Sequence, residues 1–287
     1  MRALQNILNQ HGRAAFLIGN GPNLAANIMP SWEELLGSAA DDPIRPELLE
    51  GLSNTEIYDL VQMKSQEPQN VRKKVCDLLE LNGIHDLGVH ENLMKFARDQ
   101  RCPVLTTNFD KALESSVGAE LIHLDSRGFT RFYPWKSYYG FERLTLPTNG
   151  FGIWKIHGDI NYTDSIRLGL TDYMGSAERA RRLIHNGDEA LFRGKRQKMW
   201  KGHQTWLHIW FNMPIIIFGL KCGKDEVFIR WLLIERKRYL NLYGDPMKVY
   251  YISKGTPEPE VSNLMRNLDA EIITTDHYSE LYGNGRY

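Results

Sequence analysis

The segment that decides the fold is AAFLIGNGPN, residues 14–23. An uninterrupted apolar run comes first, and Gly19 and Gly21 follow it directly. Such a run, ended by glycines, is typical of a buried strand in a parallel sheet. Glycines between a strand and a helix let the backbone approach a phosphate, and the helix N-terminus supplies free N–H groups. The segment therefore predicts the first β–α unit of a sheet, with a turn that either holds a dinucleotide or is a plain tight turn.

Six more apolar runs have the character of buried strands, and helical spacing follows several of them. After Ser31, a suitable N-cap, Trp32, Leu35 and Leu36 fall on one helical face. Strands that alternate with helices predict a doubly wound, mostly parallel, Rossmann-like α/β sheet. We expect a single domain over residues 1–287. The six further strands are expected at residues 104–108, 120–124, 153–157, 214–219, 248–252 and 271–275.

Three stretches interrupt the alternation. Residues 38–100 show only helical spacing and predict a helical insertion. Residues 128–150 are rich in aromatic side chains among Gly and Pro, which predicts a loop that is a lid, an interface, or packed on its own side chains. Residues 176–210 are basic and suit a solvated helix face, a dock for an acidic partner, or a nucleic-acid contact. Trp200, Trp206 and Trp210 in that stretch are expected to face the core or a subunit interface.

Composition narrows the function classes. Thirty-five basic residues balance thirty-five acidic ones, so net charge gives no general attraction to nucleic acid or membrane. The three cysteines are far apart in sequence, which argues against a disulfide framework and against zinc held by CxxC pairs. The N-terminus lacks the pattern of a secretory signal, and the longest apolar run is too short to span a bilayer. We expect a cytoplasmic protein without a membrane segment.

Polar side chains follow two of the expected strands. VLTTNFD (residues 104–110) ends in Thr107, Asn108 and Asp110, and WKIHGD (residues 154–159) places His157 beside a glycine. The carboxyl ends of parallel strands meet at one edge of a sheet, where α/β proteins bind ligands. Asp110 also suits a plain helix cap, and a lone histidine is commonly structural. Because His157 ends an expected central strand beside a glycine, we favour a functional role for it.

These motifs together resemble the sirtuin superfamily, and most closely its bacterial NAD-hydrolysing branch that acts in antiphage defence. The resemblance extends over residues 14–37, 102–124, 152–175 and 213–235. It rests on GNG (19–21), PSW (30–32), TTNFD (106–110), KIHGD (155–159), LGLTDY (168–173), and IIFGL (216–220) followed by Asp225 and Glu226.

The resemblance implies a set of site residues. NAD, as the substrate, would lie with its diphosphate over Gly19, Asn20 and Gly21, with Asn23 and Thr107 also in the binding site. Asn108 would hold the ribose hydroxyls and a water, and His157 would be the general base or hydrogen-bond a ribose hydroxyl. Asp110 would hold the nicotinamide amide or the Asn108 loop. The glycine turn of the late strand, Gly219 and Leu220, would close over the nucleotide. No metal is implied.

The activity that the resemblance implies is hydrolysis of the nicotinamide–ribose bond of NAD to nicotinamide and ADP-ribose, in a defence effector that depletes NAD. A homo-oligomer or an activating protein partner is expected with it. The alternatives are a non-catalytic NAD or ADP-ribose-binding subunit of a larger complex and an NAD-dependent protein deacylase. Deacylating sirtuins carry two zinc-binding CxxC pairs, which this chain lacks. A dehydrogenase is disfavoured because Leu24 stands where the dinucleotide fingerprint has its third glycine.

Overall fold

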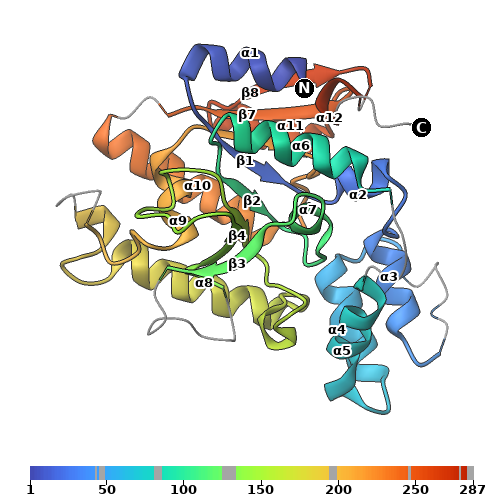
Figure 1. The fold of residues 1–287 in the computed structure, drawn as a ribbon. Helices are drawn as coiled ribbons and strands as arrows, with labels where there is room; N and C mark the ends of the chain where they lie inside the picture. Colours follow the sequence, from blue (N-terminus) through green and yellow to red (C-terminus); the bar gives the residue numbers. More distant parts are fainter. Residues whose placement is uncertain are drawn as a thin grey trace.

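The computed structural model describes residues 1–42, 44, 49–80, 86–124, 134–193, 199–244, 247–277 and 279–282. Its centre is an eight-stranded sheet with the order β3-β4-β5-β2-β1-β6-β7-β8 (Figure 1). Only β4 runs antiparallel to its neighbours among these strands. The strands are β1 (Ala15–Ile18), β2 (Val104–Thr106), β3 (Glu120–His123), β4 (Ser137–Gly140), β5 (Ile153–Lys155), β6 (Ile215–Phe218), β7 (Val249–Lys254) and β8 (Glu271–Thr275).

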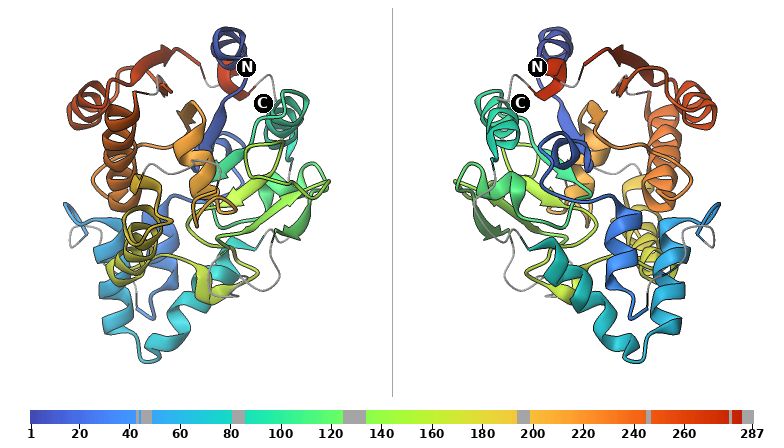
Figure 2. Two further views of the ribbon diagram at one scale, coloured as in Figure 1. Left: turned by 90° about the vertical axis from the view of Figure 1, so that its left-hand side faces the viewer. Right: turned by 90° about the vertical axis from the view of Figure 1, so that its right-hand side faces the viewer.

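Helices cover both faces of the sheet, so the predicted doubly wound α/β architecture is confirmed (Figure 2). Alternate residues of each strand point to opposite faces. In β1, Leu17 packs in the core beneath α9 and α10, and Phe16 packs in the core beneath α1 and α6. The helices are α1 (Arg2–His11), α2 (Gly21–Ala25), α3 (Trp32–Ala39), α4 (Asn54–Lys64), α5 (Val71–Leu79), α6 (Gly88–Asp99), α7 (Ala112–Ser115), α8 (Leu170–His185), α9 (Trp206–Asn212), α10 (Val227–Tyr243), α11 (Pro259–Asn267) and α12 (Ser279–Tyr282), with short 3-10 turns η2 (Pro68–Asn70), η3 (Thr163–Ser165) and η4 (Leu191–Arg193).

All seven strands expected from the sequence are present. The inner strands β1, β2, β5 and β6 are buried along their whole length, as continuous apolar runs predict. The strand β4 was missed. It lies inside the stretch that we expected to be a loop, and that expectation is wrong for residues 137–140. The residues of β4, SYYG, stand among further aromatic and glycine residues rather than in an apolar run, so the sequence does not distinguish a strand there. Residues 128–133 of that stretch lie outside the described part of the chain.

Helices are the only regular secondary structure in the described part of the stretch 38–100, and they pack in two places. Helices α3, α4 and α5 form a small core of their own, which also takes in Phe109, Ile166 and Leu168. Capping boxes at Ser31 and Ser53 fix the starts of α3 and α4. Helix α6 instead packs on the sheet beside α1. The α3–α5 unit therefore lies against the loops that follow β2 and β5, at one end of the sheet (Figures 1 and 2).

The basic stretch holds the second half of α8, the turn η4 and the start of α9, and its residues 194–198 lie outside the described part of the chain. Trp200, Trp206 and Trp210 are buried in the core, as expected. On the exposed side of α8, Arg181 and Arg182 both pair with Glu178. That pairing fits a solvated helix face. Within the described residues, no helix is long and apolar enough to cross a membrane.

The central position of β2 gives a stability prediction. Leu105 is fully buried in the sheet core, and we expect Leu105→Ala to lower the free energy of unfolding by about 2–5 kcal/mol. The same substitution at Leu242, which is 67% exposed on α10, should change it by no more than about 0.5 kcal/mol. Urea unfolding of the two variants checks the burial of Leu105 in the sheet core. Equal losses in the free energy of unfolding would contradict that burial.

Candidate functional site

The sheet has a switch point at β1. Strand β1 pairs with β2 on one side and with β6 on the other, and both pairings are parallel. From β2 the sheet continues to β5, and from β6 it continues to β7 and β8. Open α/β sheets bind ligands outside the carboxyl ends of the strands at such a point. The loops that follow β1, β2, β5 and β6 are therefore the ones that build the candidate site.

The turns after β1 and β6 pack directly on each other. Gly21 donates its backbone N–H to the Gly219 carbonyl at 2.9 Å. A Cβ on Gly19 would lie 2.5 Å from the Gly219 carbonyl oxygen, and a Cβ on Gly21 would lie 2.5 Å from the Gly219 Cα. Gly219 itself has φ of 63°, a conformation that favours glycine. The structure thus brings together Gly19, Gly21, Gly219 and Leu220, and the close backbone contact alone requires the glycines.

Asn108 ties the turn after β2 to the turn after β1. Its side-chain Nδ2 donates to the Gly19 carbonyl at 3.1 Å, and its backbone N–H donates to the Thr106 hydroxyl at 3.1 Å. Within the described residues, no donor reaches its Oδ1. The side chain is 5% exposed. Asn108 therefore braces the glycine turn with one end of its amide and keeps the other end as an acceptor.

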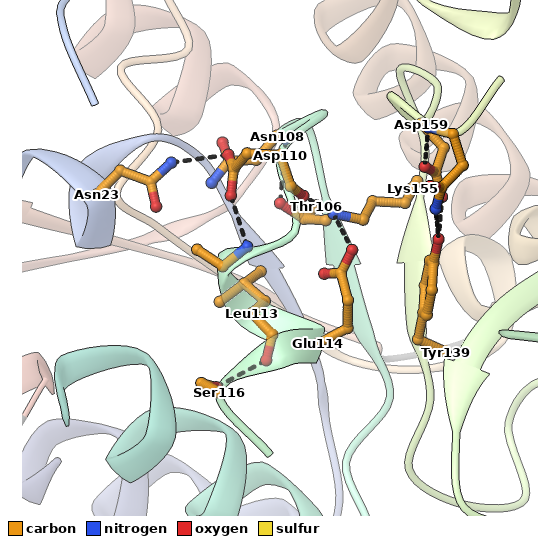
Figure 3. A network of polar contacts seen from close by, with 12 residues as sticks. Asn23, Thr106, Asn108, Asp110, Leu113, Glu114, Ser116, Tyr139, Lys155 and Asp159 are labelled. Carbon is orange, nitrogen blue, oxygen red and sulfur yellow. Dashed lines mark hydrogen bonds and ion pairs between the residues drawn. The ribbon is translucent and has the colours of Figure 1, made fainter. Parts of the chain in front are cut away.

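Asp110 and Asn23 belong to a buried hydrogen-bond network behind the turn (Figure 3). Asn23 Nδ2 donates to Asn20 Oδ1 at 2.9 Å and to Asp110 Oδ2 at 2.8 Å, and Asn23 Oδ1 accepts from His90 Nε2 at 2.8 Å. Asp110 Oδ1 accepts from the Ala112 backbone at 2.9 Å and so caps α7. Both carboxylate oxygens have protein donors. This supports Asp110 as the residue that holds the Asn108 loop, rather than as a ligand of nicotinamide.

His90 stays neutral in that network. The side chain is fully buried, and burial lowers its pKa to about 4, against a smaller opposing effect of Asp110. Because Asn23 Oδ1 can only accept, the proton of the neutral ring lies on Nε2. The role of His90 could not be predicted from the sequence, because its partner Asn23 lies 67 positions away.

A second buried cluster lies on the other side of Asp110. Lys155, in the strand that leads to His157, forms a 2.9 Å ion pair with Glu114 and also donates to the Asp110 backbone carbonyl (Figure 3). Burial raises the pKa of Glu114 to about 7, although Lys155 opposes the shift. Burial disfavours the charge of Lys155, but the nearby carboxylates, with Glu114 foremost, overcome this and raise its pKa. Close by, Tyr139 donates to Asp159 Oδ2 at 2.6 Å.

A pocket opens between the α3–α5 unit and the carboxyl edge of the sheet. Its cavity volume is about 40 Å³, which is room for a few water molecules. Two residues expected from the sequence, Thr107 and His157, line it together. The other lining residues are Trp32, Leu36, Asn54, Thr55, Phe109, Arg167, Leu168, Tyr173, Asp225 and Glu226.

His157 is one of the titratable residues that line this pocket. The side chain is 2% exposed, and Nε2 lies 3.2 Å from Glu226 Oε2. The edge of the ring packs against Tyr173, with ring centroids 5.1 Å apart. The second ring nitrogen, Nδ1, is buried and has no hydrogen-bond partner among the described residues. A buried nitrogen without a partner is costly unless a ligand or water supplies one. Nδ1 of His157 is thus open to a hydrogen bond from a ligand or a water.

The pocket carries acidic charge on the side that α10 provides. Asp225 and Glu226 are adjacent, and burial raises the pKa of Asp225, while a hydrogen bond from the Asn54 backbone opposes this. Arg167 also lines the pocket, and its guanidinium lies 3.7 Å from the Asp172 carboxylate. Such a surface suits a ligand with a cationic part.

The site expected from the sequence therefore divides into two groups. Thr107 and His157 share the pocket, while Gly19, Gly21, Gly219 and Asn108 form the braced turns beside it. The side chains of Asn23 and Asp110 are used inside the protein. The sequence analysis did not assign Asn54 and Thr55 of α4 to the site, because they lie in the stretch 38–100 that was expected to be an insertion, and it expected Trp32 only on a helical face and in the PSW motif. It quoted Asp225 and Glu226 without a role.

A comparison with protein families matches residues 103–202 to the SIR2-like domain. The matched segment contains TTNFD and KIHGD but neither the glycine turn after β1 nor Asp225 and Glu226. No curated protein matches the chain. The similarity supports a relationship with the sirtuin-like superfamily and an NAD-binding or NAD-processing role. In the described part of the chain, no group of three or more His, Cys, Asp or Glu side chains could hold a metal ion.

The Lys155–Glu114 pair gives a double-substitution test. Lys155→Met leaves a buried carboxyl group without its partner, so we expect a loss of about 3–5 kcal/mol in the free energy of unfolding. Lys155→Met combined with Glu114→Leu should recover most of that loss. The exposed pair Lys224–Glu260 is the control, where Lys224→Met should cost no more than about 1 kcal/mol. Denaturant unfolding measures all of these, and an additive double variant would contradict the pairing.

His90 gives a pH test. Its folded pKa of about 4 lies below the unfolded value, so it contributes stability above the unfolded pKa that is lost as pH falls toward 4. Between pH 7 and pH 5 the loss from this one group is roughly 2 kcal/mol. His90→Gln keeps a donor for Asn23 and does not titrate, so its stability should fall less over this range. Parallel pH profiles of the variant and the wild type would show that His90 is not buried as a neutral ring.

Proposed function

We propose that the protein is an NAD glycohydrolase that cleaves the nicotinamide–ribose bond to give nicotinamide and ADP-ribose. The observation that carries the proposal is His157, with a buried and unpartnered Nδ1, in a pocket at the switch point of the sheet. The similarity of residues 103–202 to the SIR2-like domain makes NAD the nucleotide of choice.

The chemistry needs few groups. The C1′–N bond of NAD breaks with its electron pair going to nicotinamide, which leaves as a neutral molecule, so no general acid is required. The ribose carbon becomes an oxocarbenium-like centre. Asp225 would stabilise this positive charge electrostatically. A water oxygen then bonds to C1′, and its proton passes to His157.

The other residues position the substrate in this proposal. The braced turns at Gly19–Gly21 and Gly219–Leu220 would lie beside the diphosphate, with Asn20 and Thr107 next to them. Asn108 Nδ2 is used by Gly19, so Oδ1 would accept from a ribose hydroxyl or from the attacking water. Asn23 and Asp110 would act from behind, by holding Asn20 and the Asn108 loop.

The biological setting is also part of the proposal. We place the enzyme in the cytoplasm as a defence effector that depletes NAD, kept quiet until a protein partner or self-association activates it. Unregulated loss of NAD would be toxic to the cell, so a hydrolase of this kind needs a switch. The domain organisation, one domain over residues 1–287 with an inserted helical unit, likewise stays a prediction.

His157→Ala removes the proposed base, and general-base help typically contributes 10²–10⁴-fold to a rate. We expect turnover of NAD to fall by about that factor. Asn108→Ala removes the ribose or water acceptor and should reduce turnover comparably. The matched control is His277→Ala, an exposed histidine away from the pocket, which should keep wild-type activity. HPLC of nicotinamide and ADP-ribose, with circular dichroism to check folding, measures the outcome.

The same assay separates the alternatives. A deacylase would convert an acetyl-lysine peptide and NAD to O-acetyl-ADP-ribose, which mass spectrometry detects. A nucleotide-binding subunit would bind NAD in calorimetry and release no nicotinamide, even with partners present. Either result, or normal NAD cleavage by His157→Ala, contradicts the proposed hydrolase site.

A further inference from the structure

Glu226 stands next to His157 although the two residues are 69 positions apart in sequence. It is the N-cap residue of α10, the helix that follows the turn after β6. Its carboxylate is partly exposed, 22%, and lines the same pocket as His157. The positive end of the α10 dipole stabilises negative charge at this position. The fold therefore places the Glu226 carboxylate beside the His157 imidazole.

The contact favours one position for the proton of the neutral ring. An ionised carboxylate can only accept a hydrogen bond. Because Oε2 lies 3.2 Å from Nε2, the neutral ring must carry its proton on Nε2. The lone pair is then on Nδ1, the nitrogen that has no partner among the described residues. The free lone pair is what a general base requires.

Packing fixes the ring plane as well. Tyr173 contacts the ring edge-on, and Phe228, the second residue of α10, lies 6.2 Å away between ring centroids. Glu226 and Phe228 belong to the same helix start. One end of α10 thus controls both the orientation of the imidazole and the position of its proton.

We infer that Glu226 is a positioning residue that holds His157 as the Nε2–H tautomer and so makes Nδ1 the basic atom. This inference rests on the proposed function for its catalytic consequence. When Nδ1 takes the proton of the attacking water, the ring becomes an imidazolium, and the Glu226 carboxylate stabilises the new charge. The water oxygen meanwhile bonds to the ribose carbon, so the charges and atoms balance.

The first test reads the tautomer directly. NMR of the ¹⁵N-histidine-labelled protein at pH 8 distinguishes protonated from unprotonated ring nitrogens, and the His157 signals are those that His157→Gln removes. We expect the proton on Nε2 in the wild type. In Glu226→Gln the amide can donate or accept, so both tautomers should appear. Glu178→Gln, an equal change on the exposed side of α8, should leave the wild-type pattern. A proton on Nδ1 in the wild type overturns the inference, whether or not the variants fold.

The second test is kinetic. Glu226→Gln should lower kcat for NAD by about 10²–10⁴-fold, because a wrongly protonated base loses most of its effect. The KM should change little, because the substitution keeps the size of the side chain. Glu178→Gln should match the wild type. An unchanged tautomer, or a shifted tautomer with unchanged kcat, overturns the positioning role. If the wild type cleaves no NAD but the tautomer shifts in Glu226→Gln, the proposed function fails while the pairing of Glu226 and His157 stands.

Discussion

The contact on which the site depends is the close approach of the turns after β1 and β6. A side chain on Gly19 or Gly21 would overlap the backbone of Gly219, and no repacking of side chains can relieve a backbone clash. The contact joins the two strands at the switch point of the sheet and fixes the turn between β6 and α10. Because Glu226 is the N-cap residue of α10, the same contact helps to place the Glu226 carboxylate beside His157. The turn at Gly19–Gly21, whose sequence suggests phosphate binding, therefore also has a structural role: it packs against the turn after β6.

Two polar networks then hold the loop after β2 from opposite sides. Asn23 reaches Asp110 from the turn after β1, and Lys155 reaches the Asp110 carbonyl from β5. Both networks are buried, so their hydrogen bonds are strong and a missing partner is costly. Their effect is to fix Thr107 and Asn108 between the strands that flank them. Thr107 and Asn108 are therefore held in place by buried residues behind them.

Strands were predictable here because the inner ones are apolar along their whole length, and polar residues at their ends marked the loops that build the site. What the sequence could not show were contacts between distant residues. Glu226 was visible as part of a motif, but its pairing with His157 depends on the way α10 starts beside β5. His90 and Glu114 look like ordinary helical residues until the fold buries them. β4 escaped because it gains its stability from β3 and β5 rather than from its own four residues.

The pocket lies between the sheet and the α3–α5 unit. One wall belongs to the sheet and α10, and the other to the α3–α5 unit with its own core. A cavity of about 40 Å³ is far smaller than a dinucleotide, so it matches only a small part of such a ligand. The contacts that join the two walls are both apolar and polar: Phe109, Ile166 and Leu168 pack into the α3–α5 core, Arg72 binds Asp172 at 2.8 Å, and Asp59 accepts from the Leu170 backbone at 3.3 Å. A partly exposed ion pair of this kind stabilises the arrangement only modestly, so the shared apolar core is the main contact that holds the two walls of the pocket together.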